Sequence, residues 1–258
     1  MNMNESFATD MNDNQRRLLE EILLSTEKIP DAPVKDMVIG NHLITVTSAN
    51  TGLCTKMMPH SLGISDKLSC FSGSAKELAS LLVNPLPESP DTISFAMAAI
   101  NSLLPVPEVA FPFKAQDLIV KNGKGKNAAV IGHFPFVEKI RPAFSNLWVL
   151  EIHPRPGDLP AENAKRLIPQ ADIIALTATT LLNGTCTDIL SLIRKDAFII
   201  MLGPSTPFAP CLFDWGIDAL AGCFVKNTPL VNSYIREGLP FRKLMGIDKL
   251  IWLVEKGS

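Results

Sequence analysis

The sequence predicts an α/β protein in which a small α+β unit precedes an open, mostly parallel sheet of the Rossmann-like kind. In the second half, short apolar runs alternate with helical patterns, as in a parallel sheet with crossover helices. One such unit stands out. The run at residues 128–131 leads into Gly132 and a short helix, and the run at 147–150 then ends in Glu151. In the first half, alternating strands come before two helices, which is typical of an α+β unit.

The first half begins with polar residues and then becomes periodic. Residues 1–12 are rich in Asn and predict a disordered leader. The α+β unit is expected to cover residues 13–112, with Asp91 as the cap of its last helix. Its predicted helices are residues 15–28, 75–83 and 91–104, and its predicted strands are 38–40, 42–47 and 53–58, with a turn at 48–52.

The second half, residues 113–258, is expected to form the Rossmann-like unit. A proline-rich stretch at 105–113 predicts an extended segment packed against the body, and residues 117–120 fit a short helix or a strand. Pro135 is placed at the start of the helix after Gly132. The remaining predicted strands are residues 172–177, 197–202 and 219–225, and the remaining helices are 185–193 and 228–238.

Composition excludes several classes of protein. The 258 residues are 47% hydrophobic and 19% charged, which describes an ordered protein with a sizeable core. The net charge of −2 and the lack of a basic patch argue against nucleic-acid binding. No apolar stretch is long enough for a membrane span or a secretory signal, so the expected location is the cytoplasm. The five cysteines lack a C-x-x-C pair, which favours reduced thiols over a structural zinc site.

The turns that follow the predicted strands are unusually polar. In an open α/β sheet the carboxyl ends of the strands share one rim, and ligands bind there. His133 and Glu151 are candidate transition-metal ligands, and His153 adds a second imidazole nearby. The candidate ligand-binding residues are His133, Glu151, Thr180, Asn183 and Ser205, with Asn101 contributed by the first unit. A purely structural alternative stays open, in which Thr185 caps its helix, Asn183 takes a tight turn and His133 is a hydrogen-bonded packing residue.

The loop after the first parallel strand disfavours classical NAD. A pyrophosphate needs Gly-x-Gly-x-x-Gly, whereas residues 132–136 contain one glycine and two phenylalanines. Glu151 nevertheless lies about twenty residues after Gly132, where an acidic residue binds ribose hydroxyls. A cofactor with adenosine but no pyrophosphate, such as S-adenosylmethionine, is therefore compatible with the sequence.

Three long blocks resemble an uncharacterised prokaryotic family that is associated with heavy-metal chelation. They are residues 130–137, 171–185 and 202–207, and residues 91–104 also resemble a helix of that family's first domain. The resemblance implies a first domain similar to the amino-terminal domain of enolase, a Rossmann-like second domain, and a ligand site in the cleft between them. It implies that His133, Glu151, Thr180, Asn183 and Ser205 lie at this cleft.

These observations favour a protein that binds a small molecule, a transition metal or a metal chelate, in heavy-metal chelation or transition-metal handling. One alternative is an enzyme that uses a nucleotide-like cofactor such as S-adenosylmethionine, and another is a non-catalytic interaction protein. We expect no nucleic-acid or membrane partner. The sequence leaves open the identity of the ligand, the metal, catalysis and the oligomeric state, a homo-oligomer included.

Overall fold

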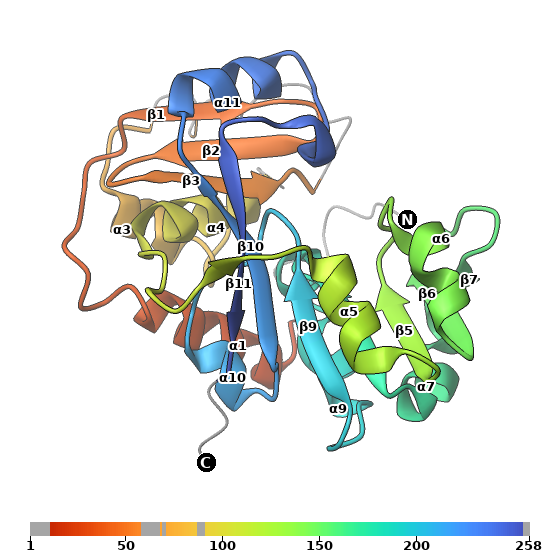
Figure 1. Cartoon of the computed structure of the whole chain (residues 1–258). Coiled ribbons are helices and arrows are strands. Elements are labelled where there is room, and N and C mark those ends of the chain that lie inside the picture. The colour runs from red at the N-terminus through yellow and green to blue at the C-terminus, as the bar shows by residue number, and fades with distance from the viewer. Residues whose placement is uncertain (1–10, 58–67, 69–70, 87–90, 255–258) are drawn as a thin grey trace.

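The computed structural model describes residues 11–57, 68, 71–86 and 91–254. In this part of the chain it has a mostly parallel eight-stranded sheet and a separate three-stranded antiparallel sheet (Figure 1). The predicted fold class is therefore confirmed. Among the described residues, no helix is both long enough and apolar enough to cross a membrane.

The small sheet is a meander of β1 (Asp36–Ile39), β2 (Leu43–Thr47) and β3 (Thr51–Thr55). The predicted turn at 48–52 is wrong at its end, because Thr51 and Gly52 are already paired with Thr47 and Val46. A Cβ on Gly52 would lie 1.9 Å from the carbonyl oxygen of Ala98, so this glycine lets a helix approach the strand closely. Residue 58, the predicted end of this strand, lies outside the described residues.

Helices cover both faces of the small sheet (Figure 1). On one side lie α3 (Ala75–Ser80), which begins with a capping box of Ser74 and Glu77, and α4 (Thr92–Leu103). On the other lies α11 (Thr228–Arg236), which comes from the second half of the chain. Asp91 occupies the N-cap position of α4 as expected, but its side chain makes no cap hydrogen bond.

The large sheet contains six neighbouring parallel strands. Their spatial order reads 3-2-1-4-5-6 in chain order, which is the Rossmann arrangement, with the switch point between β5 and β8. In that order they are β7 (Leu159–Pro160), β6 (Asn146–Glu151), β5 (Asn127–Ile131), β8 (Ile173–Thr177), β9 (Phe198–Leu202) and β10 (Ala219–Val225). Two antiparallel strands, β11 (Ile247–Leu253) and β4 (Phe111–Pro112), extend the sheet beyond β10. Neither β7 nor β11 was expected from the sequence.

The helices around this sheet are short. They are α5 (Ala115–Gly123), α6 (Val137–Ile140), α7 (Ala164–Leu167), α8 (Thr179–Leu182), α9 (Cys186–Ser191) and α10 (Cys211–Asp214). Residues 117–120 are thus helical. Pro135 does not start a helix. It forms a turn with Phe136, and α6 begins at Val137, two residues after Pro135. The side chain of Thr185 makes no cap hydrogen bond to α9.

Helix α1 (Asp13–Leu24) packs against α9 and α10, two of the helices around the large sheet. The fully buried Gln15 fixes this contact: its Nε2 donates to the carbonyl of Leu181 at 3.0 Å, and its Oε1 accepts from the backbone N–H of Thr187 at 3.1 Å. Contacts of α1 and α11 therefore cross the predicted boundary between 13–112 and 113–258 in both directions, and the boundary itself stays a prediction. Residues 1–10 of the predicted leader lie outside the described residues.

Candidate functional site

The switch point of the large sheet brings the ends of β5 and β8 together at Gly132. This glycine has φ +100°, and a Cβ there would lie 3.0 Å from Cγ2 of Thr177. The conformation and the close approach both require glycine at this position. His133, the next residue, therefore starts its loop at the place where open α/β sheets bind ligands.

The carboxylate of Glu151, at the end of β6, holds this loop in place. Its Oε1 accepts a hydrogen bond from the backbone N–H of His133 at 2.9 Å, and its Oε2 accepts one from Ile152 at 3.0 Å. The structure thus brings His133 and Glu151 together as the sequence suggested. The contact joins the carboxylate to the backbone of His133 and not to its imidazole.

The imidazole of His133 contacts Asp158, which no sequence pattern indicated. Its Nδ1 lies 3.0 Å from Oδ2 and 3.2 Å from Oδ1 of Asp158. The side chain of His133 is 25% exposed, whereas that of Asp158 is 3% exposed. Oδ2 of Asp158 also accepts a hydrogen bond from the backbone N–H of Arg155 at 3.1 Å. The imidazole of His133 is therefore partly exposed, and the buried carboxylate of Asp158 contacts it at Nδ1.

Thr180 and Asn183, which follow β8, make local hydrogen bonds. The buried Thr180 donates its hydroxyl to the carbonyl of Thr177 at 2.7 Å. The amide oxygen of Asn183 accepts from the hydroxyl of Thr185 at 2.7 Å and from its backbone N–H at 3.2 Å. These bonds hold both side chains within their own turn. For Asn183, this is the structural role that the sequence left open as an alternative to ligand binding.

Ser205 and Asn101 lie beside β3 of the small sheet. The hydroxyl oxygen of the buried Ser205 accepts from the backbone N–H of Thr55 at 2.9 Å. The amide of Asn101 donates to the carbonyl of Leu53 at 3.0 Å. By their hydrogen bonds, the predicted site residues form three separate sets. His133 and Glu151 are linked to each other, and Thr180 and Asn183 are bonded within their own turn. Ser205 and Asn101 are bonded to β3.

A metal site made by the protein alone is not found in the described residues, where no three His, Cys, Asp or Glu side chains are grouped to hold an ion. The second predicted imidazole, His153, is exposed. Burial raises the pKa of Cys54, Cys186 and Cys223 to about 12, so these thiols stay protonated and are poor metal ligands. The single imidazole of His133 fits a metal only if the metal brings other ligands with it.

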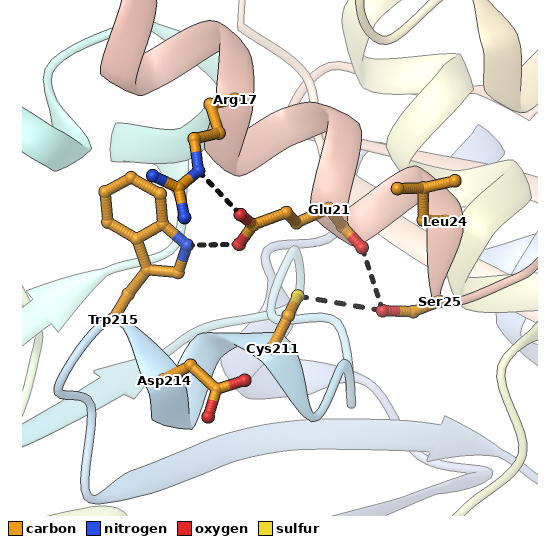
Figure 2. Close-up of a pocket in the computed structure, with 7 residues that line it drawn as sticks. All are labelled: Arg17, Glu21, Leu24, Ser25, Cys211, Asp214 and Trp215. Carbon is orange, nitrogen blue, oxygen red and sulfur yellow. Dashed lines mark hydrogen bonds and ion pairs between the residues drawn. The ribbon is translucent and has the colours of Figure 1, made fainter.

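Two open hollows in the described part of the chain lie away from these residues. The larger, about 570 Å³, lies between α1 and α10 (Figure 2). There the carboxylate of Glu21 accepts from Nε1 of Trp215 at 2.6 Å and from Nε of Arg17 at 2.8 Å. The bond to Trp215 joins α1 to the end of α10. The second hollow, about 490 Å³, is lined by Asn50, Pro105, Val106, Ala110, Phe224, Asp248 and Leu250.

Comparison with known proteins agrees with this architecture. The profile of the family DUF364, described as "Putative heavy-metal chelation", matches residues 114–250. A DUF364 protein with unknown function from Desulfitobacterium hafniense has a crystal structure with TM-score 0.81 and 22% identity, covering 94% of this chain and 100% of that one. A second, from Pyrococcus horikoshii, has TM-score 0.76 and 20% identity, covering 92% and 100%. No curated protein matches the chain. At these identities the two likenesses show a shared fold.

Proposed function

The chain belongs to the DUF364 family, whose profile covers more than half of it, and from this premise we propose that it binds a small metal complex. The proposed site lies at the rim formed by the carboxyl ends of β5, β6 and β8. His133 is the side chain that contacts the ligand. The proposal specifies a ligand and a place, which the family description leaves open.

One observation carries this proposal: a partly exposed imidazole is held at the switch point of a Rossmann-type sheet. Its backbone is fixed by Glu151 and its ring by Asp158. A binding group that is fixed at both ends loses little conformational freedom when a ligand arrives. Imidazole is also a common donor to zinc, copper, iron and nickel.

A metal complex fits this site better than a bare ion. Structural metal sites use four protein ligands and catalytic zinc sites use three, but the described residues offer no such set. Each oxygen of Glu151 accepts one backbone N–H and keeps a second lone pair, so Glu151 is proposed as the second contact to the ligand. A metal held by one or two protein groups must keep most of its other ligands.

The test is native mass spectrometry with elemental analysis, first on the protein as purified and then after incubation with nickel nitrilotriacetate. We expect a one-to-one adduct on the wild type that His133→Ala reduces at least tenfold. The matched control is His153→Ala, which removes an exposed imidazole two residues after Glu151 and should bind as the wild type does. Equal adducts on wild type and His133→Ala, or none on either, would refute the proposal.

A second candidate is an enzyme that uses S-adenosylmethionine, because Glu151 ends the second strand of the parallel sheet. It ranks second because it depends on Glu151 alone and gives no role to the imidazole of His133, which Asp158 holds in place. Incubation with S-adenosylmethionine in the same experiment discriminates the two candidates by mass. A folded protein that retains neither compound would favour a non-catalytic interaction protein.

A further inference from the structure

We infer that Asp158 is a positioning residue that presents Nε2 of His133 to the ligand, and that the ligand is a metal complex with an exchangeable coordination position. This inference rests on the proposed function and narrows it in two ways. It assigns a role to a residue that no sequence pattern indicated. It also divides metal complexes into those that the site accepts and those that it rejects.

The contact with Asp158 determines which ring nitrogen of His133 carries the proton. A carboxylate only accepts hydrogen bonds, so Nδ1 of His133, 3.0 Å from Oδ2 of Asp158, must carry the proton in the neutral ring. The lone pair is then on Nε2, at the other side of the ring. Many metal-binding histidines donate their second N–H to a carboxylate in this way, which fixes the tautomer and raises the basicity of the ligating nitrogen.

Asp158 is itself held by hydrogen bonds within its own loop. Its backbone N–H donates to the carbonyl of Arg155 at 2.9 Å, and the backbone N–H of Arg155 donates to Oδ2 at 3.1 Å. Gly157, with φ +94°, allows this tight turn. The carboxylate is therefore tied to its own loop and stays oriented toward the ring whether or not a ligand is bound.

Two further charged side chains, Glu138 and Arg141, interact with the His133–Asp158 pair. Arg141 donates to both oxygens of Glu138, at 2.7 and 3.1 Å, and to the carbonyl of Leu147 at 2.7 Å. The Glu138 carboxylate beside it raises the pKa of Arg141, with burial acting in the opposite direction. Arg141 also interacts electrostatically with Asp158, and Glu138 with His133, so the two carboxylates of Glu138 and Asp158 exceed the single guanidinium by one negative charge beside the ring. That charge favours a metal cation at Nε2.

The single imidazole restricts the class of metal complex that can bind. One nitrogen donor binds a complexed metal by replacing a weakly held ligand such as water. Nickel nitrilotriacetate keeps two such positions, whereas in nickel ethylenediaminetetraacetate the chelator occupies them. The site should therefore bind the first complex and reject the second, although both carry the same metal and carboxylate groups.

Two measurements test the inference on the full chain. The first is nitrogen-15 NMR of the metal-free protein labelled at histidine, with resonances assigned by the His133→Ala variant. We expect His133 to carry its proton on Nδ1 in the wild type and to lose this preference in Asp158→Ala. The second is calorimetric titration, in which Asp158→Ala should weaken nickel nitrilotriacetate binding 10- to 100-fold.

Two further variants separate positioning from folding. In Asp158→Asn, one amide oxygen at the place of Oδ2 can still accept from both Nδ1 and Arg155, so it should keep the tautomer and restore part of the affinity. Asp196→Ala removes an exposed carboxylate and should change neither measurement. An unchanged tautomer and affinity in Asp158→Ala would overturn the role of Asp158.

The ligand class has its own outcomes. Equal binding of the two nickel complexes would overturn the requirement for an exchangeable position while leaving the proposed function intact. Binding of neither complex would overturn the proposed function and the ligand class together. The NMR measurement on metal-free protein decides the role of Asp158 in every case.

Discussion

The hydroxyl oxygen of Ser205 lies 2.9 Å from the backbone nitrogen of Thr55, so the loop after β9 of the large sheet is hydrogen-bonded to the last residue of β3 in the small sheet. Ser205 is 1% exposed. The thiol of Cys54 also lies 3.4 Å from this hydroxyl. One side chain thus connects the two sheets at the rim, which gives Ser205 a structural role whatever ligand the rim binds.

Replacement of Ser205 by Ala should lower the free energy of unfolding by about 1–3 kcal/mol, because the N–H of Thr55 loses its acceptor in a partly buried place. Urea unfolding followed by circular dichroism measures this. The matched control is Ser191→Ala, whose exposed hydroxyl bonds only the carbonyl of Asp188 in its own helix, and the change there should stay below about 0.5 kcal/mol. Equal effects of the two variants would contradict the role of Ser205 as a link.

Replacement of Gly132 by Ala should destabilise the protein more than replacement of Gly157. Both glycines have a similar positive φ, +100° and +94°, so both variants carry a comparable backbone cost of about 1–2 kcal/mol. Only at Gly132 does the new Cβ meet Thr177, at 3.0 Å, whereas at Gly157 nothing lies within 4 Å. We expect an additional loss of about 1–3 kcal/mol for Gly132→Ala. Indistinguishable unfolding curves for the two variants would show that Thr177 moves away from the new Cβ without a cost in free energy.

The sequence predicted the strands that carry the rim more successfully than the contacts between the side chains on it. A buried parallel strand leaves an apolar run in the sequence. The strand before Gly132 and the strand that ends in Glu151 were therefore predicted from their apolar runs alone. Asp158 was missed because it precedes β7, a strand of two residues, Leu159–Pro160, which is too short to leave a periodic signal. Without β7, nothing in the sequence placed the preceding turn beside His133.

Long-range packing is a second reason why the sequence predicted only part of the structure. Helix α1 shows an apolar face, but a periodic pattern does not say which sheet that face covers. Gln15 decides it by bonding Leu181 and Thr187, and a buried Gln on a helix reads as an ordinary polar position in the sequence. For Glu151, the residue type suits a ribose, a metal or two backbone N–H groups equally well, and only geometry separates them.

Replacement of Glu151 by Gln should lower both stability and binding. The carboxylate accepts from two backbone N–H groups, whereas an amide offers one oxygen and turns an N–H₂ toward the second donor. We expect a loss of about 1–3 kcal/mol in unfolding free energy and weaker binding of nickel nitrilotriacetate through movement of His133. Glu162→Gln, which changes an exposed carboxylate, is the control. Full stability with lost binding would contradict the role of Glu151 in holding the His133 loop and leave only its proposed contact with the ligand.

Asp172 gives a prediction about pH. The backbone N–H of Asn127, at 2.9 Å, holds the pKa of this carboxyl below its usual value, with a further contribution from Arg194, while burial opposes the shift. A lowered pKa in the folded state means that Asp172 stabilises the fold fully above its unfolded-state pKa of about 3.9, and that this stability is lost as the pH falls through the lower folded value.

Asp172→Asn should therefore lower the free energy of unfolding at pH 7 by about 1–3 kcal/mol, and the difference from the wild type should shrink progressively below about pH 4. The control is Asp196→Asn, because Asp196 pairs with the same Arg194 but its side chain is 75% exposed, and such exposed pairs contribute about 0–1 kcal/mol. Urea unfolding at a series of pH values from 7 to 3 measures both variants. A gap between Asp172→Asn and the wild type that stays constant down to pH 3 would show that the stabilisation comes from the shape of the side chain and not from its charge.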